Sequence, residues 1–142
     1  MQKKSRRGLL VAANAPGTPR LEKRSPYPPR DPAIGASLFS RAVAYGNLLF
    51  LSGIGNHTPR TIEVATRDVI EELEQSLIGA GSSLQKCLKA DVFLRSLADY
   101  DAMNSVWRSY DWGMVPTVRT TVAPAEGIPG HSLIEIDVIA YI

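Results

Sequence analysis

The segment SLIEIDVIAYI, residues 132–142, constrains the fold most, because its polar and apolar residues alternate strictly. One set of alternate positions is entirely apolar: Ile134, Ile136, Val138, Ala140 and Ile142. The other set carries two carboxylates, Glu135 and Asp137. Since successive side chains of a strand point to opposite faces, this pattern predicts a strand with one face in the core.

A hairpin is predicted near the start of the folded region. Residues 37–45 alternate along its first strand, Gly46 and Asn47 supply the turn, and the second strand follows at once. Residues 48–51 form a continuous apolar run, which is typical of a strand covered on both faces. Ser52 and Gly53 end this second strand.

Two helices are predicted, each followed by a strand. Apolar residues recur every three or four positions over residues 63–80, where we expect Thr66 to be the N-cap and glycines at 79 and 81 to end the helix. A strand is then predicted over residues 88–94. The second helix is predicted over residues 97–107 and the next strand over 117–122.

The element order is therefore β-β-α-β-α-β-β, which predicts an α+β fold with both helices on one face of a sheet. We expect the other face to carry Glu135 and Arg119. A single chain would expose that face to solvent, and a partner subunit could cover it. The predicted domain spans residues 33–142.

Residues 1–32 differ in composition from this domain. They contain six of the ten prolines, and residues 1–30 carry eight Lys or Arg and one acid. The net charge of +2 thus divides into +7 for residues 1–30 and −5 for the remainder. This composition predicts a basic, proline-rich, extended N-terminal segment. The acidic remainder argues against a broad nucleic-acid-binding face.

Targeting signals in the sequence are weak. KKSRRGLLVAANA, within residues 1–15, resembles a twin-arginine export signal, but its apolar stretch is short for that role. No apolar run approaches the roughly 20 residues that cross a bilayer. The single cysteine, Cys87, excludes an intramolecular disulfide. We expect a cytoplasmic protein.

Metal and cofactor chemistry is not predicted. His57 and His131 stand in separate loops without metal-ligand spacing, and neither a Cys/His cluster nor a glycine-rich phosphate loop occurs in the sequence. We therefore expect no metal and no cofactor. Cys87 has no histidine close to it in the sequence, so we expect a structural thiol.

The segment PTVRTT, residues 116–121, places Arg119 among β-branched residues that favour a strand. Such a guanidinium can lie over apolar side chains with its charge in solvent. Alternatively, it is kept on an inner face because it binds a carboxylate through two parallel hydrogen bonds. The strand pattern leaves both interpretations open.

Several motifs in the same order resemble the Rid (YjgF) family of reactive-intermediate deaminases. RTTVAPAEGIPGHSLIEIDVIAYI is similar to the C-terminal signature of that family. AIGASLFSRAV and GNLLFLSG resemble the family motifs PIGPYSQAV and GNLVFVSGQ, and AGSSLQKCLKADVFLRSLADYDAMNSVW resembles the region between them and the signature. The resemblance extends from Ala33 to Ile142.

The resemblance implies a chorismate-mutase-like fold and a homotrimer in which three sheets form a barrel core. It implies ligand sites between subunits and hydrolysis of 2-imino or enamine acids, such as 2-iminopropanoate and 2-iminobutanoate, to 2-keto acids and ammonia. No cofactor is implied.

The family motifs also imply roles for individual residues. Arg119 would bind the substrate carboxylate, and Glu135 would position or deprotonate the attacking water. Asn104, Ser52 and Gly53 would contact the substrate or shape the pocket. Each has a structural alternative: Glu135 as an ion-pair partner, Asn104 as an exposed helical amide, and the Ser-Gly pair as a simple turn.

Three departures from the family pattern bear on substrate range. Phe39 stands where many relatives carry tyrosine, Thr121 stands where several carry cysteine, and the loop GNHTPRT is shorter than usual. Both Phe39 and Thr121 would still line the substrate site.

Two alternatives to catalysis remain. The trimer could bind small carboxylates without turnover, which the missing tyrosine hydroxyl at Phe39 favours. It could also bind or cleave RNA, as some relatives do, with the basic segment making salt-sensitive contacts; the acidic domain argues against this alternative.

Overall fold

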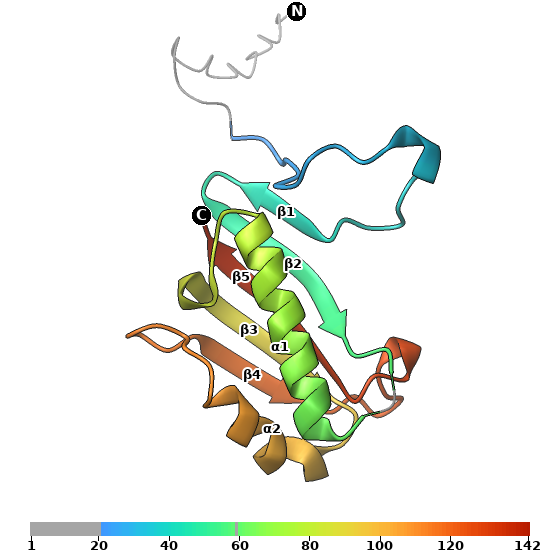
Figure 1. Cartoon of the computed structure of the whole chain (residues 1–142), viewed down its shortest axis with the longest axis vertical. Helices are drawn as coiled ribbons and strands as arrows, with labels where there is room; N and C mark the ends of the chain where they lie inside the picture. Colours follow the sequence, from blue (N-terminus) through green and yellow to red (C-terminus); the bar gives the residue numbers. More distant parts are fainter. Residues whose placement is uncertain (1–20, 59) are drawn as a thin grey trace, which may run out of the picture.

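The alternating C-terminal segment forms the central strand of a five-stranded sheet. A computed structural model describes residues 21–58 and 60–142 (Figure 1). Its strands and helices follow in this order: β1 Ala42–Tyr45, β2 Leu48–Gly55, α1 Ile62–Gly79, β3 Cys87–Leu94, α2 Tyr100–Trp107, β4 Val118–Val122 and β5 Ile134–Tyr141. The predicted α+β class and element order are confirmed.

The strand order across the sheet is β1-β2-β5-β3-β4. β3 and β4 run parallel, and the other neighbouring pairs are antiparallel. Helix α1 crosses one face of the sheet and contacts α2, which lies near β4 (Figure 1). Both helices therefore cover the same face, hereafter the helix face, and the opposite face is called the open face.

The core lies between α1 and the helix face of the sheet. In β5 the predicted apolar set is buried at Ile134, Ile136, Val138 and Ala140, while the residues between them are partly exposed. Helix α1 contributes Val69, Ile70, Leu73 and Leu77, each at most 1% exposed. The periodicities of two and of about 3.6 residues thus meet in one hydrophobic layer.

Helix α1 begins one turn earlier than its predicted cap. Thr61 is the N-cap, and its side chain accepts a hydrogen bond from Val64 N at 3.4 Å. The predicted cap, Thr66, is instead buried inside the helix and donates its hydroxyl to Ile62 O at 2.7 Å. The predicted glycine stop is confirmed, because Gly81 has a φ of +83° just after the helix.

The first hairpin strand is shorter than predicted. Only Ala42–Tyr45 form β1, and Ser52 N donates to Arg41 O as the last backbone contact of the pair. Before that point the chain leaves the sheet, and Leu38 is 96% exposed. The turn prediction is confirmed by a φ of +59° at Gly46, a value that suits the first central position of a type II′ turn.

The prediction that residues 48–51 are covered on both faces is wrong for the single chain. Leu49 and Leu51 are buried against the helices, but Phe50 is 40% exposed on the open face. The apolar run reflects two different surfaces, one packed in the core and one lying on the open sheet.

Part of the N-terminal segment lies along the sheet edge. Arg24 and Ala44 exchange two backbone hydrogen bonds of 3.0 and 2.9 Å. The Tyr27 hydroxyl donates to Ser76 O of α1 at 3.0 Å. Residues 21–32 therefore contact both β1 and α1. The predicted export-like motif lies outside the described residues, and none of the helices that the structure describes is long and apolar enough to cross a bilayer.

Candidate functional site

Strand register determines which face of the sheet each candidate side chain occupies. In the parallel β3–β4 pair, Ala90 lies beside Arg119 and Val92 beside Thr121. Ala90 and Val92 are fully buried under the helices, so Arg119 and Thr121 also belong to the helix face.

Glu135 lies on the open face, because it pairs with Phe93, which alternates with the buried residues of β3. The expectation that Arg119 shares a sheet face with Glu135 is therefore wrong. β4 is a short edge strand without a fully buried position, so its alternation does not reveal which of its faces points toward the helices.

Helix α2 holds the Arg119 guanidinium. Arg119 Nη2 donates to Asn104 Oδ1 at 2.6 Å. Its Cζ atom lies 4.8 Å from the centre of the Trp107 ring and 5.9 Å from that of Tyr100. Trp107 in turn stacks on Trp112, with ring centres 3.9 Å apart. Arg119 Nη1 also donates to Met103 Sδ at 3.8 Å, so the guanidinium is oriented by two hydrogen bonds and by cation–π contacts.

The charge of Arg119 has no acidic partner in the part of the chain that the structure describes, where the ion pairs are Arg60–Asp68 and Lys89–Asp91. Arg119 also lines a hollow of about 390 Å³, together with Leu97, Tyr100 and Thr121. Because a guanidinium has five N–H donors, the bonds to Asn104 and Met103 leave three donors for a carboxylate.

Asn104 is 8% exposed and accepts from Arg119, so it is not the exposed helical amide considered as an alternative. It faces the arginine through its carbonyl oxygen. The geometry therefore gives Asn104 a positioning role toward Arg119, whereas the sequence motif implied contact with the substrate.

Glu135 lies against two glycines at the end of β2. A Cβ added at Gly53 would overlap Glu135 Oε1 and lie 2.7 Å from its Cδ atom. A Cβ at Gly55 would lie 2.6 Å from Ser132 Oγ and 3.5 Å from Glu135 Oε2. The pairing of β2 with β5 is irregular between Leu51 and Ile54, which is where this close approach occurs.

A second hollow, of about 430 Å³, brings four predicted residues together: Phe39, Ser52, Gly53 and Glu135. Ser52 Oγ donates to Ser40 O at 2.7 Å and so ties the loop that carries Phe39 to the end of β2. His57 also lines this hollow, through the loop that the sequence singled out.

Asn56 is a positioning residue that the sequence did not reveal. It is 7% exposed, and its Oδ1 accepts from the backbone N–H groups of Leu133 and Ile134 at 2.8 and 3.3 Å. Ser132 Oγ donates to Asn56 O at 2.7 Å. These bonds fix the start of β5, and hence Glu135, relative to β2. A polar residue directly after a glycine-containing strand was the available signal.

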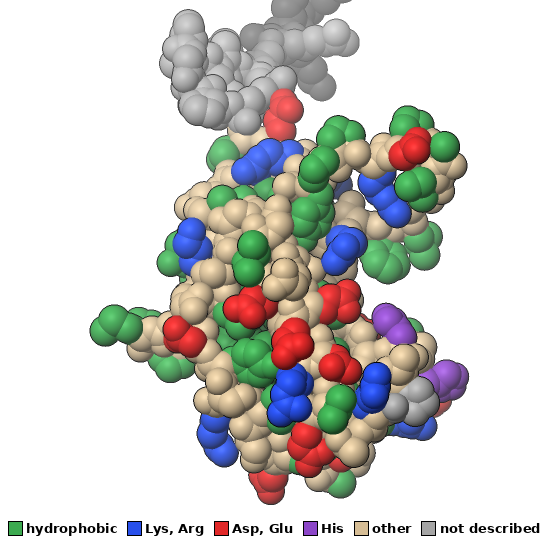
Figure 2. Space-filling model, viewed as in Figure 1, with side chains coloured by type: hydrophobic (Ala, Val, Ile, Leu, Met, Phe, Trp, Pro, Cys, Tyr) green, Lys and Arg blue, Asp and Glu red, His purple; other side chains and the backbone are tan. Residues whose placement is uncertain are grey.

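The remaining titratable candidates show no metal or thiolate chemistry. Burial raises the pKa of Cys87 to about 12, so its thiol is neutral at physiological pH. Within residues 21–58 and 60–142, no group of three or more His, Cys, Asp or Glu side chains is arranged to hold a metal ion. Figure 2 shows acidic side chains gathered over the face that α1 covers, with fewer basic ones among them, in line with the five acids and one arginine of α1.

The candidate residues thus form two half-sites on opposite faces of one sheet. The Arg119 half-site lies at the β4 edge, and the Glu135 half-site lies beside the free end of β2. A small substrate cannot touch both within one chain, because the sheet and its core lie between them. A site that used both halves would therefore need two chains side by side.

Comparisons with known proteins agree with this fold. The profile of the family described as Endoribonuclease L-PSP matches residues 31–142. "Protein mmf2, mitochondrial" of Schizosaccharomyces pombe is 42% identical over 110 residues, which are 72% of this chain and 86% of that protein. The "2-iminobutanoate/2-iminopropanoate deaminase" of Dermatophagoides farinae is 30% identical over 111 residues, 73% of this chain and 85% of that protein.

Solved structures agree as well. The crystal structure of a YjgF family member from Neisseria meningitidis superimposes with a TM-score of 0.71 and 28% identity, covering 85% of this chain and 95% of that one. The matched region contains both half-sites and every strand of the sheet. The chain therefore belongs to the Rid (YjgF) family, the family that the Endoribonuclease L-PSP profile describes.

Proposed function

We propose that this protein is a deaminase that hydrolyses reactive 2-imino and enamine acids to 2-keto acids and ammonia. The observation that carries the proposal is the Arg119 guanidinium, which Asn104 and Trp107 orient toward an open hollow without an acidic partner among the described residues. Family membership and the similarity to a protein named as an imine deaminase support it.

The proposed reaction needs few protein groups. Arg119 holds the substrate carboxylate through two hydrogen bonds and so fixes the imine carbon. Glu135 positions a water molecule and takes a proton as the oxygen attacks that carbon. The C–N bond then breaks, nitrogen leaves as ammonia after gaining protons, and the C=O bond of the 2-keto acid forms. Phe39, Ser52, Gly53 and Thr121 shape the surroundings.

The two half-sites lie apart in one chain, so the proposal includes a composite site in a homotrimer. In this trimer the open faces turn inward, and the β4 edge of one chain lies beside the free end of β2 of the next. The open face carries partly exposed apolar side chains that such packing would cover: Tyr45, Leu48, Phe50, Val118, Val122 and Tyr141. A patch of this kind is unusual on a monomer. In the assembly, Arg119 of one chain would face Glu135 of the next. A cytoplasmic location stays a prediction.

The proposal is tested by trapping the imine. An amino acid oxidase generates 2-iminopropanoate from alanine, semicarbazide traps it, and semicarbazone formation is followed by absorbance. We expect the wild type to suppress trapping, and both Arg119→Ala and Glu135→Gln to lose most of that effect. Arg67→Ala, which changes an exposed arginine on α1, is the matched control. Unchanged trapping with wild type and several imines would refute deamination.

The composite site has its own test. Native mass spectrometry gives the mass of the assembly, and mixing Arg119→Ala with Glu135→Gln chains should restore activity at interfaces that carry both intact residues. Restored activity supports a site shared between chains. If every mixture is inactive although its subunits have exchanged, the site is not shared between chains.

One observation favours a second candidate function, the binding of small carboxylates without turnover. Phe39 lines the Glu135 half-site and lacks the tyrosine hydroxyl that many relatives carry at that position. In that case pyruvate would bind to the wild type and bind more weakly to Arg119→Ala. The wild type would leave the trapping of imines by semicarbazide unchanged.

A further inference from the structure

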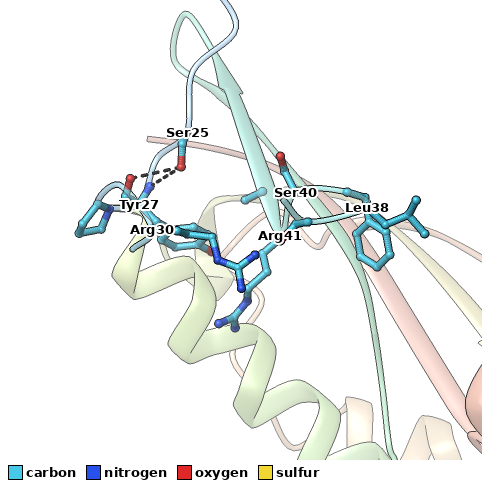
Figure 3. A pocket seen from close by; sticks show the side chains of 10 residues that line it. Ser25, Tyr27, Arg30, Leu38, Ser40 and Arg41 are labelled. Carbon is cyan, nitrogen blue, oxygen red and sulfur yellow. Dashed lines mark hydrogen bonds between the residues drawn. The ribbon is translucent and has the colours of Figure 1, made fainter. Parts of the chain in front are cut away.

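The N-terminal segment and the loop before β1 form a hollow of about 510 Å³ (Figure 3). Unlike the two half-sites, this hollow is lined by residues of the N-terminal segment. One wall is formed by residues 25–30 and the other by residues 37–42. Its volume lies within the range of small-molecule sites.

Both walls are fixed to the fold by hydrogen bonds. The Tyr27 hydroxyl binds α1 through Ser76 O, and Arg24 is paired with β1. Ser25 Oγ donates to Tyr27 O and accepts from Tyr27 N, both at 3.2 Å, which closes a tight turn in the first wall. Ser52 Oγ holds the second wall through Ser40 O. The hollow is therefore a feature of the packed structure.

Two arginines reach into this hollow from its two walls. Arg30 comes from the N-terminal segment and Arg41 from the residue before β1, and Figure 3 shows their guanidinium groups pointing into the same region. Arg41 donates one hydrogen bond to Ser76 Oγ at 3.0 Å and lies 5.9 Å from the centre of the Tyr27 ring. Most of its N–H donors remain available.

No acid neutralises this pair within the described part of the chain. The residues that line the hollow include no Asp or Glu, and neither arginine forms an ion pair with another described residue. Two guanidinium groups placed together repel each other, and a bound dianion would remove that repulsion while accepting from both forks. The same walls present the exposed apolar side chains of Leu38 and Phe39.

The family profile does not account for this hollow. Its match begins at residue 31, so Ser25, Tyr27, Pro28 and Arg30 lie outside it. Arg119, Asn104 and Glu135 do not line it. Phe39 and Arg41 line both this hollow and the one that contains Glu135, so the two are neighbours.

We propose that this hollow binds a small phosphate monoester, with the phosphate held between Arg30 and Arg41 and an apolar organic group lying against Leu38 and Phe39. A phosphate monoester carries two charges near neutral pH and three oxygens that can accept from two guanidinium groups. This binding site shares Phe39 with the Glu135 half-site but uses neither Arg119 nor Glu135, so its test is separate from the test of deamination.

The probe is phenyl phosphate, and binding to the full-length protein is measured by isothermal titration calorimetry. We expect it to bind more tightly than inorganic phosphate, which lacks the apolar group, and more tightly than phenyl sulfate, which has the same shape with one charge. Arg30→Ala and Arg41→Gln should each weaken binding of phenyl phosphate by about tenfold, the loss expected for a charged hydrogen bond.

Three controls make the result specific. Arg119→Ala should retain phenyl phosphate binding, which separates this hollow from the Arg119 half-site, and Arg67→Ala should do the same. A thermal melt of each variant identifies unfolded protein. Because Arg30 is solvent-exposed, Arg30→Ala keeps the test valid even if Arg41→Gln unfolds.

A pH series supplies an independent readout. The lining residues include no Asp, Glu, His, Lys or Cys, but His57, Glu72 and Glu135 line the adjoining hollow that shares Arg41. Phenyl sulfate, whose charge is constant between pH 5.5 and 7.5, therefore serves as the reference for any change in the protein. With a second phosphate pKa near 6, the dianion fraction and hence the affinity for phenyl phosphate should rise about fourfold, while phenyl sulfate binding stays constant. Equal binding of phosphate and sulfate esters, or unchanged binding by Arg30→Ala, would overturn the proposal.

Discussion

At the residue scale, Arg119 owes its orientation to neighbours on α2. The Asn104 side chain is almost fully buried and accepts one N–H of the guanidinium, while the Trp107 ring lies beneath its plane. An arginine on an edge strand would otherwise sample many rotamers. Fixing it in advance reduces the entropy lost when a carboxylate binds.

Asn104→Ala tests this positioning role. We expect pyruvate, a 2-keto acid product of the proposed reaction, to bind about tenfold more weakly, because Arg119 loses the bond that orients it. Calorimetric titration measures the affinity, and a thermal melt reports stability. Ser105→Ala is the matched control, since Ser105 is the neighbouring exposed residue of α2 and donates only to Asp101 O. Equal affinities in the two variants would contradict the role.

Gly53→Ala tests the close approach of Glu135 to β2. The new methyl group would overlap the carboxylate, so either Glu135 moves or the strand shifts. We expect loss of imine hydrolysis together with lower stability. Gly79→Ala is the control, because its Cβ would meet only Tyr27 at 3.7 Å, an ordinary contact, and Ala is favoured over Gly in helices by about 0.5–1 kcal/mol.

A double-variant cycle identifies the cause of the Gly53→Ala effect. If the clash with the carboxylate is responsible, Gly53→Ala should cost less stability when combined with Glu135→Ala than in the wild type. Additive free energies of unfolding would mean that backbone strain, and not Glu135, produces the loss.

Sequence motifs identified these residues but not their geometry. The types and order of Arg119, Glu135, Ser52 and Gly53 were readable, because the strands that carry them have clear patterns. The sheet face on which Arg119 lies could not be predicted, since a five-residue edge strand that is partly exposed on both sides has no distinctive alternation. Asn56 was missed because its role depends on backbone groups more than 70 residues away.

At the element scale, helices and strands with one fully buried face were predicted well. β5 follows its alternation throughout, and α1 follows its apolar repeat. Errors arose at ends, where few contacts decide the boundary. Thr61 and Thr66 both suit an N-cap by residue type, and the added turn is settled by burial of Ile62 and Ala65 against the core.

The cap assignment predicts different effects for the two threonines. Thr61→Ala should lower the free energy of unfolding by about 0.5–1 kcal/mol, because the N–H of Val64 loses its side-chain acceptor. Thr66→Val should change stability less, since valine keeps the shape and the Ile62 carbonyl keeps its helical position. Urea denaturation of both variants decides the matter, and a larger cost for Thr66→Val would contradict the cap assignment.

At the scale of the whole molecule, the open face carries acids close to one another. Asp91 and Asp137 are directly opposite in the β3–β5 pair, and Lys89 forms an ion pair with Asp91. The pKa of Asp137 is raised, first by burial and then by the negative charge of Asp91, whereas Lys89 lowers it. The folded state therefore holds a proton at Asp137 more firmly than the unfolded chain.

Because its pKa is raised, Asp137 contributes most to stability below about pH 3.8, the ordinary pKa of an aspartate. This contribution is lost as the pH rises through the higher pKa of the folded state. Asp111 is the opposite case, because hydrogen bonds from the Gln85 side chain and the Gly113 N–H lower its pKa. Its contribution is present above the ordinary pKa and is lost as the pH falls through the folded value.

The two aspartates thus predict opposite changes for the same chemical substitution. At pH 7, Asp137→Asn should be more stable than the wild type by less than about 1 kcal/mol, since the side chain is partly exposed and its charge is screened. Asp111→Asn should be less stable at pH 7. The difference for Asp137→Asn should shrink toward zero as the pH falls below about 3.8, the ordinary pKa, whereas the difference for Asp111→Asn should vanish only at lower pH, below the lowered pKa of the folded state. Urea unfolding of each variant across this pH range measures the differences, and a change of the same sign for both variants at pH 7 would contradict the opposite pKa shifts of the two aspartates.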